Sequence, residues 1–141
     1  MKRKQRTEIL INGSGTVAAE LAQQIKERYE VATVEEPNHG LIMVKVRETA
    51  QKSLFYLGEV FVTECKVEIA GRIGVGIVKG DEPQLAFDLA VIDAAYEAGL
   101  QETAAWQAKL AAEAERIEEQ RLAYGEQVLR TKVNFETMDT D

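Results

Sequence analysis

Apolar residues at helical spacing predict three helices. The first runs from Ser14 to near Tyr29, with apolar side chains every three to five residues. The second begins after Asp81, which with Gln84 has the spacing of a capping box, and it ends at Gly99. Pro83 is tolerated there because it lies in the first turn. The third helix, rich in Ala, Glu and Gln, extends from Gln101 to about Gln127.

Between the first two helices, apolar and polar residues alternate with period two, which is typical of strands with one wet face. Residues 37–40 (Pro-Asn-His-Gly) predict a turn between two short strands, and Gly58 predicts a break between two more. A turn at 70–72 precedes the last strand. Because the strands follow one another without crossover helices, the class is α+β. We expect an antiparallel sheet of four to five strands, flanked by an N-terminal helix and C-terminal helices.

The two ends of the chain break this pattern. Residues 1–8 are polar and are expected to be frayed. The third helix has a thin apolar stripe interrupted at Arg121, and a helix of that kind usually lacks a partner in its own chain. Residues 128–141 are expected to form an extended C-terminal tail whose apolar residues dock onto the same domain or onto a partner.

Composition narrows the class of protein. With 141 residues the chain is expected to be one domain, 1–141. Its net charge of −7 argues against nucleic-acid binding. One cysteine and one histidine exclude a disulfide framework or an iron–sulfur cluster held by this chain alone. No apolar stretch is long enough to span a membrane and the basic start lacks the apolar region of a signal peptide, so we expect a cytoplasmic protein.

Most candidate chemistry has a plainer structural explanation. Residues 71–80 are glycine-rich like a phosphate loop, but they lie within an alternating strand, so a bulge or a close backbone approach is favoured. Cys65 is interpreted as a small buried hydrophobe. His39, in the predicted turn, is more plausible as a solvent-facing residue than as a base. Asp93 borders an apolar helix face and should have a hydrogen-bond partner, while Glu59 begins a strand.

Three segments in register resemble a known family. They are Phe55–Thr63 (FYLGEVFVT), Gly74–Asp81 (GVGIVKGD) leading into Leu89–Ala94, and Lys132–Met138 (KVNFETM). Their order and spacing resemble PhnG, a subunit of the bacterial carbon–phosphorus lyase system, from about Glu8 to Met138. The sequence departs from the family pattern at Glu136, where a second aromatic residue is expected.

This resemblance implies a role in using phosphonates as a phosphorus source. The family acts with PhnI, PhnH and PhnL to transfer the ribose 5-triphosphate unit of MgATP to an alkylphosphonate, releasing adenine. It also belongs to a core complex with PhnH, PhnI and the radical subunit PhnJ. An acidic chain without a phosphate cradle should not hold these polyanions alone. We therefore expect an accessory subunit that binds no cofactor or metal by itself, with MgATP as a substrate of the complex.

Two sets of residues follow from this interpretation. The residues expected to dock onto a partner are Trp106, Ile117, Lys132, Val133, Phe135 and Met138. No catalytic residue is assigned, and Glu59, Asp93 and His39 are the possible contributors to a site shared with another subunit. The alternative is a stand-alone α+β adaptor or ligand-binding domain unrelated to phosphonates.

Overall fold

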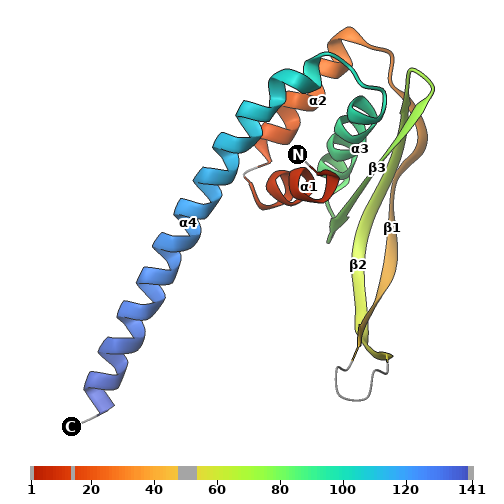
Figure 1. Cartoon of the computed structure of the whole chain (residues 1–141). Helices are drawn as coiled ribbons and strands as arrows, with labels where there is room; N and C mark the ends of the chain where they lie inside the picture. The colour runs from red at the N-terminus through yellow and green to blue at the C-terminus, as the bar shows by residue number, and fades with distance from the viewer. Residues whose placement is uncertain (1, 14, 48–53, 140–141) are drawn as a thin grey trace.

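The computed structural model describes residues 2–13, 15–47 and 54–139, with side chains in 46–57 and 129–139 outside the description. Four helices lie on one face of a three-stranded sheet (Figure 1). In chain order the elements are α1 (Arg3–Asn12), α2 (Thr16–Arg28), β1 (Ala32–Arg47), β2 (Leu54–Ile69), β3 (Arg72–Lys79), α3 (Pro83–Glu97) and α4 (Glu102–Asp139). The α+β class and the antiparallel pairing are confirmed.

The sheet has three strands in the described residues, in the order β1-β2-β3, so the expected four to five strands are not confirmed. The predicted turn at 37–40 is wrong, because β1 passes through it with a bulge between Glu35 and Asn38. Pro37 is tolerated because β1 is an edge strand. The Asn38 amide supports the bulge by donating to Glu35 and to the Glu64 carbonyl. Likewise, β2 continues through Gly58, next to a second register shift.

The N-terminal residues are helical rather than frayed. Helix α1 covers Arg3–Asn12 and buries Arg6 and Leu10 against the body of the molecule. Its local signals are weak, since its apolar residues have almost no amphipathic periodicity. A tertiary contact of Arg6 with α3, described below, holds this helix in place.

Helix α3 is the centre of the fold, because it packs against all three strands and against α1 and α2. Its residues from Leu89 to Ala95 are all buried. Two glycines of β3 allow this close approach. A Cβ on Gly74 would lie 2.2 Å from the Ala94 nitrogen, and one on Gly76 would lie 2.1 Å from the Ala86 oxygen. The glycine-rich stretch therefore serves helix–sheet packing, in agreement with the interpretation as a close backbone approach.

The last helix is longer than predicted. Helix α4 has 38 residues and is about 57 Å long at 1.5 Å per residue. The expected extended tail is wrong for residues 128–139, which continue the helix. Residues 126–139 contain no proline or glycine that would stop it, and Gly125 in the helix interior costs only about 1 kcal/mol. Residues 140–141 lie outside the described part.

Candidate functional site

Asp93 lies at the centre of the best-connected polar cluster in the described residues. It is 5% exposed, and its two carboxylate oxygens accept hydrogen bonds from Arg3 at 2.6 Å and Arg6 at 2.7 Å. One of them also accepts the backbone N–H of Val75 on β3, at 2.9 Å. One carboxylate thus joins α1, α3 and the edge strand β3. Asp93 has the partner that its position predicts, and its acceptor sites are used for holding the fold together.

The cluster continues through aromatic side chains into α4. The Arg6 guanidinium lies 3.9 Å from the centre of the Tyr96 ring, a cation–π contact. Tyr96 in turn packs edge-on against Trp106, with ring centres 5.8 Å apart. The Trp106 indole N–H donates to Gln24 of α2 at 2.9 Å. Trp106 is 2% exposed, so the structure places it in the core of this chain instead of on a surface available to a partner.

His39 lies on β1, next to the residues that lead into α3. Its Nε2 is 2.8 Å from an Asp81 carboxylate oxygen, and both side chains are at least half exposed. Its ring also packs against Phe61, with centres 4.8 Å apart. Asp81 is thus a partner of His39, and it does not form the predicted capping box. The N-cap of α3 is Glu82, whose backbone N–H is accepted by the buried Thr63 hydroxyl at 3.0 Å.

Glu59 and Cys65 both lie on β2, six residues apart. Glu59 is exposed and pairs with Met43 across the β1–β2 ribbon, in the part of β2 that does not pair with β3. Cys65 is fully buried, as predicted, and burial raises the pKa of its thiol. The three candidates for a shared site are therefore not brought together: Asp93 lies in the interior, His39 at the start of α3, and Glu59 on the free part of the ribbon.

A second junction ties α2 to α4. Glu102 is 7% exposed and accepts hydrogen bonds from the Tyr29 hydroxyl at 2.9 Å and from Arg28 at 3.2 Å. Burial alone would raise the pKa of Glu102, but hydrogen bonds from its own backbone, Tyr29 and Arg28 lower it below the usual 4.5. The hydrogen bond to Glu102 raises the pKa of Tyr29 above 10.0.

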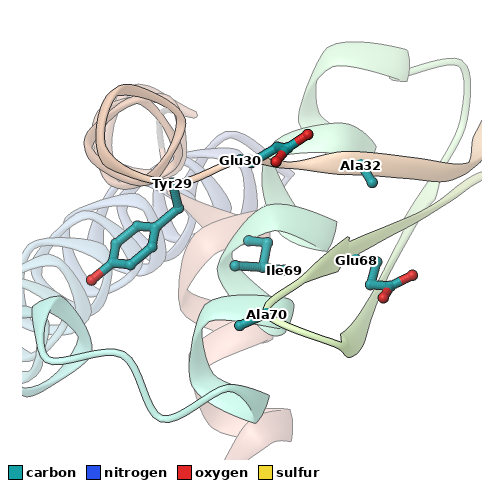
Figure 2. A pocket seen from close by; sticks show the side chains of 6 residues that line it. All are labelled: Tyr29, Glu30, Ala32, Glu68, Ile69 and Ala70. Atoms are coloured by element: carbon teal, nitrogen blue, oxygen red, sulfur yellow. The ribbon is translucent and has the colours of Figure 1, made fainter.

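The hollow beside this junction is not suited to anions. It has a volume of about 470 Å³ and lies where α2 leads into β1, next to the turn between β2 and β3. Figure 2 shows that the two charged side chains lining it, Glu30 and Glu68, are both carboxylates. Many cations elsewhere are engaged by carboxylates of the chain: Arg3, Arg6, Lys26, Arg28, Lys66, Lys109, Arg116 and Arg121 all form ion pairs. A polyphosphate bound at these cations would have to displace those carboxylates.

Within the described part of the chain, no group of three or more His, Cys, Asp or Glu side chains could hold a metal ion. In those same residues, no helix is both long and apolar enough to cross a membrane.

Exposed apolar side chains gather in two places away from these clusters. One is the free end of the β1–β2 ribbon, where Leu41 is 63% exposed and Met43 is 57% exposed. The other is α4 beyond Arg121, where Leu122, Tyr124 and Val128 are 47% to 69% exposed. Tyr124 and Val128, four residues apart on one face of the helix, are called the α4 patch below, whereas Leu122 lies about 200° around the helix axis from Tyr124. Ile117 is half-buried and lines a shallow groove between α1 and α4.

A comparison with models of known families shows which family the chain belongs to. A family model described as phosphonate metabolism protein PhnG matches residues 1–139. The chain belongs to the PhnG family. The resemblance found in the sequence is thereby confirmed, and the chain is a phosphonate metabolism protein of the PhnG family. The comparison with individual curated proteins gives no match.

The side chains of four predicted docking residues of this PhnG family member, Lys132, Val133, Phe135 and Met138, lie outside the described residues. Conversely, the sequence analysis missed the α4 patch and the exposed end of the ribbon. A signal for the first was available, because Tyr124 and Val128 continue the spacing of Trp106, Leu110 and Ile117. A signal for the second was hidden by the turn predicted at 37–40, which split the ribbon into short strands.

Proposed function

We propose that this chain is an accessory, docking subunit of the carbon–phosphorus lyase core complex. With PhnI, PhnH and PhnL it supports transfer of the ribose 5-triphosphate unit of MgATP to an alkylphosphonate, with release of adenine. PhnJ is the further partner in the core complex. In this proposal the chain contributes binding surface, and the subunits around it supply the phosphate-binding and reacting groups.

The observation that carries the proposal is the contrast between the two halves of α4. Its first half presents Trp106 and Leu110 to the core, where they are 2% and 0% exposed. The same apolar stripe then continues at Tyr124 and Val128, which are 69% and 47% exposed. Exposed aromatic and aliphatic side chains in a row on one helix are typical of a surface that another protein covers.

The polar clusters support an accessory role. Asp93 is saturated by two guanidinium groups and a backbone N–H, as expected of a carboxylate that holds helices together. The cations of the ion pairs are likewise bound to carboxylates of the chain. The charged side chains that line the hollow between α2 and β1 are themselves carboxylates. The reaction needs positive charge for the phosphates and an acid for the departing adenine, which the partner subunits would supply.

Co-expression with PhnI tests this proposal. The wild-type chain should elute with PhnI in size-exclusion chromatography, and adenine release from MgATP should change when the chain is absent. Leu122→Ser with Tyr124→Ser should weaken the shared peak, as should Phe135→Ala with Met138→Ala. The matched control is Gln120→Ser with Ala123→Ser, which changes two exposed residues in the same part of α4. Separate peaks for the wild-type chain and PhnI, with unchanged adenine release, would favour the stand-alone adaptor.

One specific observation keeps a second candidate function open, a contribution to a shared active site. Asp81 holds the exposed His39 ring at 2.8 Å, an arrangement that can orient an imidazole for proton transfer. The substitution His39→Gln in the assembled complex should then reduce adenine release steeply and leave the shared peak unchanged. Adenine release at the wild-type level would rule out this role for His39.

A further inference from the structure

The β1–β2 ribbon extends beyond the rest of the sheet. Strand β3 pairs with β2 only from Val62 to Ile69, whereas β1 pairs with β2 as far as Arg47 and Leu54. Residues 41–47 and 54–61 therefore form a two-stranded arm, which Figure 1 shows projecting past the end of β3 and away from α3. A two-stranded ribbon by itself is at best marginally stable in water.

The described side chains of this arm are mainly apolar on both faces, with Lys45 and Glu59 as its exposed charged residues. Leu41 pairs with Phe61, and Met43 lies two residues further along the same face, which is also the face that α3 covers nearer the body. Their exposed fractions are 63%, 43% and 57%. Ile42, on the opposite face, is 43% exposed. Charged side chains or proline normally protect an exposed strand edge. Strand β1 has Glu36 and Pro37 at its body end and Lys45 in the arm, but no charged residue or proline from Leu41 to Val44.

The arm and α4 project from the body on the same side. In Figure 1 both extend downward from the helices, with α4 leaving on one flank and the arm on the other. The arm face that carries Leu41, Met43 and Phe61 is the helix-covered face of the sheet, so it is turned toward the α4 flank and not away from it. One body lying under the helices could therefore contact both projections.

Area favours one partner that contacts both projections over a second copy that pairs through the arm alone. At about 150–200 Å² per large side chain, the four exposed residues of the arm present roughly 400 Å². A stable interface needs about 800 Å² from each partner. The arm falls short by itself, and the exposed side chains of α4 add to its area only if the same partner reaches them.

Charge indicates the chemistry of that partner. From Glu115 onward α4 exposes Glu115, Glu118, Glu119 and Glu126, and the exposed Arg121 pairs with Glu118 beside α1. The arm exposes Glu59 beside its cross-strand partner Met43, and Lys45 further out. A complementary protein would present an apolar surface to the arm and basic side chains to α4. A chain of net charge −7 is ill suited to the anionic surface of a membrane.

We infer that the arm is a second docking element, and that it and α4 together hold one protein subunit with an apolar surface and a basic border. This inference rests on the proposed function, because the subunit it would hold is a member of the phosphonate complex. It goes further by assigning Leu41, Met43 and Phe61 to the interface and by requiring that the arm and α4 engage the same partner.

The test compares matched variants in the co-expressed complex with PhnI, PhnH and PhnJ. Leu41→Thr with Met43→Thr removes apolar surface and keeps strand propensity. The control is Val34→Thr, at the body end of the same strand, where the side chain is 51% exposed. We expect the arm variant to bind the partner at least about tenfold more weakly, since central apolar residues dominate interface energies. The control should bind as the wild type does, and both should unfold at the wild-type midpoint.

The outcomes separate this inference from the proposed function. If the wild-type chain joins none of these subunits, the proposed function fails and the arm inference falls with it. If the wild type joins the complex and the arm variant binds equally well, the arm inference alone is overturned. The arm inference is also overturned if the chain by itself forms a dimer that the arm variant abolishes, because a second copy of the chain would then occupy the arm. Crosslinks from Met43 and Tyr124 to two different subunits would also overturn it.

Discussion

The body of the molecule and its two projections use apolar residues in opposite ways. In the body, Leu110 and Ile92 are essentially inaccessible to water, and Asp93 has all its partners within the chain. In the arm and the end of α4, Leu41 and Tyr124 are more than 60% exposed. An apolar residue in the body therefore contributes to the stability of this chain, whereas an apolar residue in the projections is exposed and available for contacts with another molecule.

The sharpest test of this contrast lies within one helix. Leu110→Ala should destabilise the chain by about 2–5 kcal/mol, because Leu110 is fully buried and its loss leaves a cavity. Leu122→Ala, twelve residues further along α4, should change the free energy of unfolding by less than about 0.5 kcal/mol. Urea denaturation of the isolated chain measures both. Equal losses would mean that the end of α4 packs against its own chain in solution.

The glycines offer a second, smaller contrast. Gly76→Ala should cost about 1–3 kcal/mol, because its Cβ would meet the backbone of α3 and force β3 and α3 apart. Gly58→Ala, on the arm, should be close to neutral, since a Cβ there meets nothing within 4 Å. Thermal unfolding of the two variants under the same conditions measures the difference. A harmless Gly76→Ala would contradict the close packing of α3 on β3.

The smallest expected effect is the pH dependence of the junction between α2 and α4. The pKa of Glu102 is lowered in the folded chain, so its contribution to stability is present above pH 4.5 and is lost as pH falls through the folded value. The pKa of Tyr29 is raised, so its contribution is present below pH 10.0 and is lost as pH rises through its folded value.

Glu102→Gln should therefore lose less stability than the wild type between neutral pH and about pH 3. Glu126→Gln, which changes an exposed glutamate on the same helix, is the control and should follow the wild type. The measurement is the urea midpoint at each pH. A wild-type acid profile in Glu102→Gln would show that the contacts of Glu102 with Tyr29 and Arg28 contribute nothing to stability.

Local signals in the sequence determined much of the fold. Periodicity and flanking residues located α2, which ends where predicted at Tyr29, and α3, which ends before Gly99. Alternation gave the α+β class and the buried face around Cys65. The order of three short segments identified the family, because spacing between motifs survives in the sequence whatever the tertiary contacts are.

Tertiary structure decided the rest, because long-range contacts overrode local preferences. Pro37 and Gly58 favour turns, but the pairing of β1 with β2 along 16-residue strands made both positions bulged parts of continuous strands. Polar residues at the N-terminus became a helix because Arg6 reaches a carboxylate 87 positions away. Only the packed structure shows that Trp106 lies inside while Leu41 and Tyr124 lie outside, since burial depends on which elements meet and not on the residue itself.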